Sequence, residues 1–111
     1  MELTDETLEV VAEQFRALAE PQRLRLLYRL KSGERTVAEL VAATGLSQPN
    51  VSKHLRVLRS NGLVARRSEG NCAYFRIAAP FVFTVCDTVC DELREADARR
   101  AAMWSARSGR S

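Results

Sequence analysis

Apolar residues recur every three or four positions through the first half of the chain, which is the period of helices that bury one face. Breaks and capping residues divide this half into four expected helices. The first follows Thr4, the second starts at Pro21, the third starts at Thr36 and is closed by Gly45, and the fourth is capped by Ser47. The pattern therefore predicts a helical N-terminal half.

The period changes to two over residues 63–68 and 72–77, which predicts two strands joined by a turn at Glu69-Gly70-Asn71. Pro80 begins a last long helix that is expected to reach about Trp104. Its apolar positions alternate spacings of four and three, as in a helix-pairing seam: Val82, Cys86, Val89, Leu93 and Ala96. The expected fold is mainly helical, with four helices, a β-hairpin wing and a final helix.

A chain of 111 residues suits one domain, which we expect over residues 1–105, with a flexible tail over residues 106–111. A chain this short buries only a modest share of its surface, so dimerisation would add burial. No apolar run approaches the roughly 18 residues of a membrane span, and the first residues are acidic, unlike a secretory signal. We therefore expect a cytoplasmic protein with no membrane contact.

Residues 36–64 have the layout of a helix-turn-helix, whose second helix can lie in the DNA major groove. Residues 46–68 carry five basic side chains and no acidic one, whereas the other residues carry 12 basic and 14 acidic ones, so a local patch attracts phosphate. In that groove Gln and Asn can pair with adenine, and Arg can pair with guanine. The residues expected to contact double-stranded DNA are Ser47, Gln48, Pro49, Asn50, Ser52, Lys53, His54, Arg56, Arg66, Arg67 and Asn71.

Two of these expectations are more specific. His54 is expected to contact the DNA backbone rather than a base. Arg66 and Arg67 follow each other in a strand, where successive side chains point to opposite faces. Both arginines therefore cannot face the same side, and we expect one to contact DNA more than the other.

Three segments resemble the arsenic-repressor (ArsR/SmtB) family of bacterial winged-helix regulators: residues 15–27, residues 46–58 with their Ser-Gln-Pro-Asn-Val-Ser-Lys-His-Leu core, and residues 62–77. The resemblance spans about residues 10–95. It implies a winged helix-turn-helix homodimer held together by its first and last helices. It also implies a repressor that binds operator DNA and releases it when an inducer binds; repression rather than activation rests on this resemblance alone.

The inducer sites of that family are incomplete in this chain. Many members bind a metal or metalloid through Cys-x-Cys-Asp at the start of the third helix, where this chain has Thr36, Ala38 and Glu39. A sulfane-sulfur class needs a cysteine in the second helix, which has none here. A zinc class uses Asp, His, His and Glu on the last helix, and both imidazoles are missing. The matching positions are Ala79, Phe81, Glu92 and Glu95.

The cysteines of the last helix are the remaining candidates for a metal site. Cys86 and Cys90 lie one turn apart, with β-carbons about 5–6 Å apart, too far for an unstrained disulfide but suitable for a soft ion. Cys72 would add the third thiolate that trivalent arsenic or antimony favours, although it lies too far along its strand to reach the pair within one subunit. Against sensing, Cys86 lies in the apolar seam, and Asp87 and Asp91 raise the thiol pKa.

The expected function is that of a dimeric transcriptional repressor that releases its operator when a metalloid, metal or thiol-reactive inducer acts at the cysteines of the last helix. The alternative is a winged-helix regulator without a thiol sensor, controlled by its abundance, an organic ligand or a protein partner. A sequence-indifferent architectural DNA binder is a further alternative. An enzyme is not expected, because the sequence has no CxxC, no activating base for a nucleophile and no cofactor loop.

Overall fold

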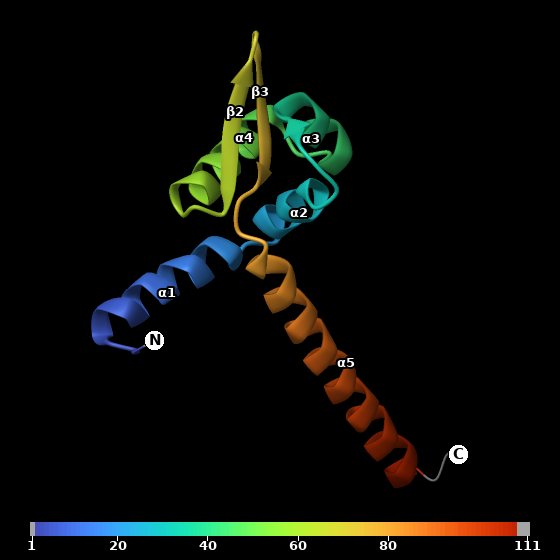
Figure 1. Ribbon diagram of the computed structural model, residues 1–111. Coiled ribbons are helices and arrows are strands. Elements are labelled where there is room, and N and C mark those ends of the chain that lie inside the picture. The colour runs from blue at the N-terminus through green and yellow to red at the C-terminus, as the bar shows by residue number, and fades with distance from the viewer. Residues whose placement is uncertain (1, 109–111) are drawn as a thin grey trace. The chain divides into compact units, whose positions relative to one another are not determined.

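The computed structural model describes residues 2–108, and the side chains of residues 2–103. The chain divides into two compact units, Met1–Ala79 and Pro80–Ser111. The second unit contains α5 (Phe81–Ser108). The first unit contains α1 (Asp5–Leu18), α2 (Pro21–Leu30), β1 (Arg35–Thr36), α3 (Val37–Thr44), α4 (Gln48–Ser60), β2 (Val64–Glu69) and β3 (Cys72–Ile77) (Figure 1). Within the described residues, no helix is long and apolar enough to cross a membrane.

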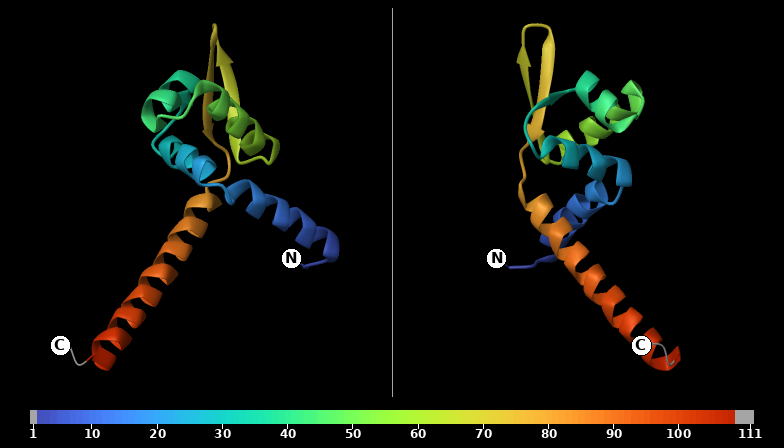
Figure 2. Two further views of the ribbon diagram at one scale, coloured as in Figure 1. Left: turned by 180° about the vertical axis from the view of Figure 1, so that it is seen from behind. Right: turned by 90° about the vertical axis from the view of Figure 1, so that its right-hand side faces the viewer.

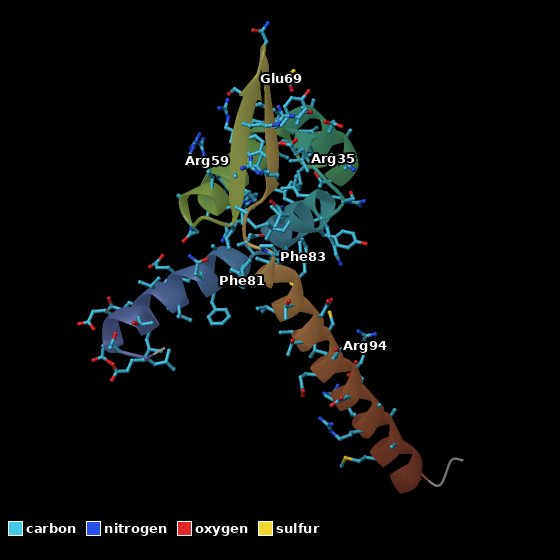
Figure 3. The ribbon with its side chains drawn as sticks, viewed as in Figure 1. Arg35, Arg59, Glu69, Phe81, Phe83 and Arg94 are labelled. Carbon is cyan, nitrogen blue, oxygen red and sulfur yellow. The ribbon has the colours of Figure 1, made fainter. Side chains whose placement is uncertain are left out.

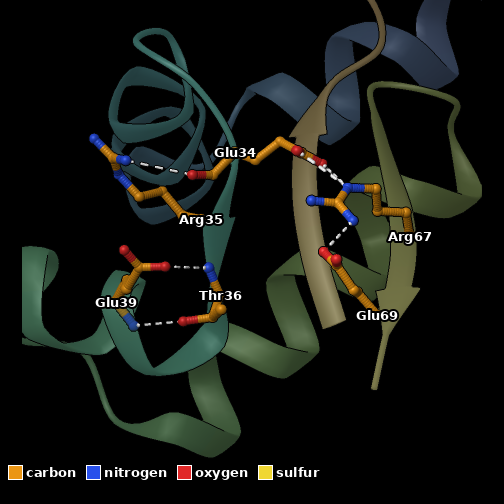
Figure 4. Close-up of polar contacts among 6 residues, drawn as sticks. All are labelled: Glu34, Arg35, Thr36, Glu39, Arg67 and Glu69. Atoms are coloured by element: carbon orange, nitrogen blue, oxygen red, sulfur yellow. Dashed lines mark hydrogen bonds and ion pairs between the residues drawn. The ribbon is translucent and has the colours of Figure 1, made fainter. Parts of the chain in front are cut away.

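Side-chain caps fix the boundaries of the two helices of the helix-turn-helix. The Thr36 hydroxyl accepts a hydrogen bond from the Glu39 backbone N–H at 3.1 Å, and the Glu39 carboxylate accepts one from the Thr36 N–H at 3.0 Å (Figure 4). Gly45 ends α3 with a φ of 75°, a conformation that glycine adopts without steric cost. Ser47 then caps α4 by accepting from the Asn50 N–H. The predicted caps are confirmed.

The core of the first unit is mainly aliphatic and joins the end of α1 to α2, α3, α4 and the sheet. From α4, Val51, Leu55 and Leu58 are fully buried, as expected of apolar residues spaced four and three positions apart on one helix face. The opposite face of α4 is thereby turned to solvent. The other fully buried side chains of this unit are Leu26, Leu27, Leu30, Leu40 and Leu63, and the remaining buried apolar residues are Ala17, Leu18, Val64 and Phe75.

The sheet has three antiparallel strands in the order β1-β3-β2. The β2–β3 register runs from Val64 opposite Ile77 to Glu69 opposite Cys72, so the loop is the two residues Gly70-Asn71. Both views in Figure 2 show the tip of this hairpin projecting beyond α3 and α4. The sequence did not predict β1, because two residues are too few to show a period of two.

The last helix is longer than expected. It continues to Ser108, past the boundary that we expected at residue 105 and through the first residues of the expected tail. Its polar surface carries ion pairs three or four residues apart, namely Asp91–Arg94, Glu95–Arg99 and Asp97–Arg100, which stabilise a solvent-exposed helix. The rest of the expected tail, residues 109–111, lies outside the described residues.

Each unit leaves apolar side chains exposed on a helix. The apolar residues Leu8, Phe15 and Leu18 recur at helical spacing on α1; Leu18 is buried, while Leu8 and Phe15 are 48% and 57% exposed. On α5, Val89 and Leu93 of the predicted seam are 52% and 59% exposed. Exposed apolar helix faces of this kind mark surfaces that association buries.

Candidate nucleic-acid interface

The N-terminal part of α4 presents polar side chains to solvent. Gln48, Asn50 and Lys53 are exposed, and the Gln48 side-chain amide donates to the Ser52 hydroxyl at 3.3 Å. Pro49 lies in the first turn, where its missing N–H has no partner to lose. A helix N-terminus with amides and hydroxyls on one face can contact both base edges and phosphates.

A basic cavity of about 230 Å³ lies where the wing meets α4. It contains three arginines, Arg56 and Arg59 from α4 and Arg66 from β2, and none of them forms an ion pair within the described residues. Arg66 donates to the Ser68 hydroxyl at 3.0 Å, which holds its guanidinium on the wing. The remaining lining residues are Val37, Ser52, Leu55 and Phe75. Three cations without a carboxylate make this cavity suited to phosphate.

Arg59 was not among the residues that the sequence led us to expect at the interface. It lies three residues after Arg56, so both share one face of α4, and that spacing was the available signal. The DNA-contacting face expected from the sequence covers only the first turns of the helix. The position of Arg59 on α4 can be followed in Figure 3.

Arg67 lies on the opposite face of the wing from Arg66, as the alternation in β2 predicts. Its guanidinium donates to Glu34 at 2.8 Å and to Glu69 at 2.8 Å (Figure 4). It also lies 4.6 Å from the centre of the Tyr74 ring. Hydrogen bonds to Glu34 and then Glu69 hold the Arg67 pKa above its usual value. The charge of Arg67 is thus already neutralised within the protein, which leaves Arg66 as the wing cation near α4.

His54 is buried, with 4% of its surface exposed, so the expected contact with the DNA backbone does not fit its position. Its Nε2 lies 2.9 Å from the Gln22 side-chain oxygen, and its Nδ1 lies 3.4 Å from the Arg23 guanidinium. Burial lowers the pKa of His54, and the charges of Lys53 and Arg23 lower it further. His54 is therefore a neutral side chain that connects α4 to α2.

The tip of the wing is exposed. Asn71 lies in the hairpin loop and lines, with Cys72 at the start of β3, a cavity of about 260 Å³ that reaches the start of α3. Both side chains are exposed, so Asn71 is accessible to a nucleic acid. The structure thus leaves Asn71 available for the contact that the sequence predicted.

The cysteine pair lies on α5. Cys86 is half-buried and Cys90 is exposed, and both are free thiols. Burial raises the pKa of the Cys86 thiol, and Cys90 and Asp87 raise it further, so the thiol form dominates at neutral pH. Within residues 2–108, no group of three or more Cys, His, Asp or Glu side chains is placed to hold a metal ion.

A capped helix-turn-helix, followed by a β-hairpin whose basic side chain meets α4, defines the winged helix-turn-helix class of DNA-binding domain. The family model described as bacterial regulatory protein, arsR family, matches residues 20–66. The chain is 42% identical over 87 residues, 78% of its length, to the transcriptional repressor SmtB homolog of Synechocystis sp.. The chain spans between 39% and 66% of the length of three curated relatives that it matches.

Solved structures show the same relationship. The crystal structure of Mycobacterium tuberculosis Rv0081 matches with a TM-score of 0.76 and 34% identity, over 88% of this chain and 99% of that one. The homodimeric winged helix-turn-helix DNA-binding domain Mb0332 from Mycobacterium bovis matches with a TM-score of 0.74 and 38% identity, over 85% of this chain and 93% of that one. The chain belongs to the arsR family of bacterial regulatory proteins, whose members are DNA-binding transcriptional regulators rather than enzymes.

Proposed function

We propose that this protein is a dimeric transcriptional repressor that binds operator DNA through α4 and the wing. The observation that carries the proposal is the basic cavity between α4 and β2, where Arg56, Arg59 and Arg66 have no carboxylate partner among the described residues. Uncompensated cations beside an exposed helix N-terminus fit the repeating phosphates of a duplex. The Synechocystis relative is named a transcriptional repressor, which supports repression.

In this proposal the interface has two functions. Gln48 and Asn50, with Ser52, Lys53 and Arg56, read base edges in the major groove, where side-chain amides match adenine and guanidinium matches guanine. The Ser47 hydroxyl and the Gln48 backbone N–H, at the start of α4, bind a phosphate. Arg59, Arg66 and Asn71 contact the backbone alongside the wing. Arg67 and His54 stabilise the protein rather than contact DNA.

We propose that two copies of the chain form a dimer through the exposed apolar side chains of α1 and α5. Leu8 and Phe15 of α1 and Val89 and Leu93 of α5 are each about half exposed or more, and two copies would bury them. The Mb0332 domain is described as homodimeric. A two-fold dimer would present two α4 helices to half-sites about one helical turn of DNA apart.

The inducer is proposed to be a metalloid, a soft metal or a thiol-reactive species that acts at Cys86 and Cys90. The two thiols share one face of α5, and the raised pKa of Cys86 includes a contribution from Cys90, consistent with their proximity. A ligand on α5 of a dimer that α5 helps to hold would change how the subunits meet, provided that it binds the two dimer states with different affinity.

A regulator without a thiol sensor is the second candidate. Two observations favour it: the Cys86 pKa is raised, which lowers the thiolate fraction, and no group of three metal-binding side chains occurs within the described part of the chain. Such a protein would respond to its own abundance, to an organic ligand or to a protein partner.

The test is fluorescence anisotropy of the reduced protein on DNA from upstream of its own gene. Arsenite, antimonite, zinc, cadmium, an oxidant and a persulfide donor are then added in turn. We expect tight binding that one of these agents reverses, and no reversal in the C86S/C90S double variant. DNA binding that none of the six agents changes would favour the regulator without a thiol sensor. Equal affinity for this DNA and for DNA of unrelated sequence would contradict the proposal of a transcriptional repressor.

The two wing arginines offer a matched comparison. We expect R66A to weaken operator binding about tenfold, because the variant loses a charged contact worth about 1.5 kcal/mol. R67A should change affinity less than threefold, because Arg67 is already paired with Glu34 and Glu69. R76A is the control, since Arg76 is exposed on the same wing face as Arg67. Equal losses for R66A and R67A would contradict the assigned faces.

A further inference from the structure

A second basic cavity lies on the first unit, formed by α2, the α2–β1 loop, β1 and α3. Its volume is about 560 Å³, within the range of pockets that hold small molecules. The residues that line it are Tyr28, Arg29, Lys31, Ser32, Arg35 and Ala43, so it contains three cationic side chains and no carboxylate. None of these residues lines the cavity between α4 and the wing.

Hydrogen bonds and a cation–π contact hold side chains of this cavity in place. Arg35 is half-buried and donates to the Ser32 hydroxyl at 3.2 Å and to the Glu34 carbonyl at 3.3 Å, which fixes its guanidinium at the cavity wall. The Arg29 guanidinium lies 5.9 Å from the centre of the Tyr28 ring. Neither Arg29 nor Arg35 forms an ion pair within the described residues. Both guanidinium groups are therefore available to bind an anion.

Tyr28 adds an apolar surface to this charge. Tyr28 is 65% exposed, so its ring is accessible to a ligand. An aromatic ring that lies offset on Tyr28 would bury apolar area and gain the stacking energy of an aromatic pair. A carboxylate or phosphate on the same ligand would then meet Arg29 and Arg35, where a guanidinium can bind two oxygens at once.

From this geometry we propose that the cavity binds a small organic anion, with an aromatic ring on Tyr28 and a carboxylate or phosphate between Arg29 and Arg35. A cationic ligand is excluded by the charge of the lining. Arg35 and Arg59 lie on opposite sides of the hairpin in the view of Figure 3, one in each cavity. The cavity is therefore separate from the proposed DNA interface, and the proposal does not depend on DNA binding.

Isothermal titration of the full chain without DNA tests the proposal, with phenyl phosphate and benzoate as aromatic anions, inorganic phosphate as an anion without a ring, and benzylamine as a cation. R29A is expected to weaken phenyl phosphate binding about tenfold, as expected for a charge-assisted hydrogen bond. R25A is the matched control, since Arg25 is exposed on α2 but does not line the cavity. Y28A should weaken phenyl phosphate and leave inorganic phosphate unchanged.

Amide resonances report where the probe binds. Phenyl phosphate should shift resonances of residues 28–35 and of Ala43, and leave residues 48–56 unchanged. Equal weakening by R25A and R29A, or binding of benzylamine as tight as that of phenyl phosphate, would overturn the proposal. A DNA duplex of unrelated sequence that shifts residues 28–35 would also overturn it, because the cavity would then belong to a DNA contact surface.

Discussion

Operator binding is expected to fall about a hundredfold or more when Arg56 and Arg59 are both replaced by alanine, while the proposed dimer remains intact. Each arginine lies in the cavity beside the wing without an acidic partner in the described part of the chain, so each is free to meet a phosphate or a base. A hydrogen bond to a charged group is worth about 1.5–3 kcal/mol, and two such contacts in each subunit act together. Both side chains are exposed, so their loss leaves the core of α4 unchanged.

The dependence of binding on salt separates a phosphate contact from a general loss of charge. For B-DNA the slope of log affinity against log salt changes by about 0.9 for each phosphate contact, so the R56A/R59A variant should have a clearly shallower slope. The control is R25A/R76A, which removes the same charge from exposed sites outside the cavity. A control that weakens binding as much as R56A/R59A, or an unchanged salt slope, would mean that the cavity does not hold DNA.

The helix-turn-helix could be predicted from the sequence because its signals are local. A capping box at Thr36 and Glu39, a glycine at the end of α3 and a serine cap before α4 each act within a few residues. The buried stripe Val51, Leu55 and Leu58 follows from helical geometry alone. The exposed face of α4 is then determined as well, which is why the expected base-reading residues lie on it.

Features that depend on contacts between distant segments could not be predicted. β1 exists because Arg35 and Thr36 pair with Phe75 and Tyr74, some forty residues further along the chain. Arg67 forms an ion pair with Glu34, and nothing in the sequence around either residue indicates that pair. The sequence places Arg66 and Arg67 on opposite faces of the strand, yet only the folded sheet shows which of these two arginines points toward α4.

His54 is the most informative of these cases. A histidine in a basic helix favours a DNA contact. Its neighbours along the chain do not decide the matter, because Lys53 is exposed and Leu55 is buried. The partners that explain its burial lie on α2, more than thirty residues earlier. Arg23 also donates to the carbonyls of Ala17 at 2.6 Å and Arg16 at 3.0 Å, at the end of α1. His54 and Arg23 thus connect α4 to α1, which carries part of the proposed dimer surface.

The geometry around His54 defines its protonation state. Nδ1 faces the Arg23 guanidinium, which has only donors, so Nδ1 accepts and the ring proton lies on Nε2, which donates to Gln22. A second proton on Nδ1 would remove that acceptor and place a positive charge against Arg23. Burial, and then the charges of Lys53 and Arg23, lower the pKa of His54 in the folded protein below 6.5.

The free energy of unfolding is therefore expected to fall as the pH drops below about 6.5. The unfolded chain takes up a proton at a higher pH than the folded chain, so the contribution of neutral His54 is complete above its unfolded pKa. This contribution is lost as the pH falls toward the lowered pKa of the folded state, and no further loss follows below it. His54 is the only histidine of the chain, and histidine is the side chain whose ordinary pKa lies within this pH range.

Urea denaturation at fixed protein concentration, at pH 7.5, 6.5 and 5.5, measures this effect. H54Q should lower the free energy of unfolding at pH 7.5 by about 1–3 kcal/mol, because Arg23 or Gln22 loses a buried partner. The variant should also remove the fall between pH 7.5 and 5.5. An imidazole pKa at or above 6.5 by NMR, or the same fall in H54Q, would contradict the assigned hydrogen bonds. Arg23 also donates to the end of α1. Such a fall would therefore come from a contact that joins α4, the helix proposed to read DNA, to a helix of the proposed dimer.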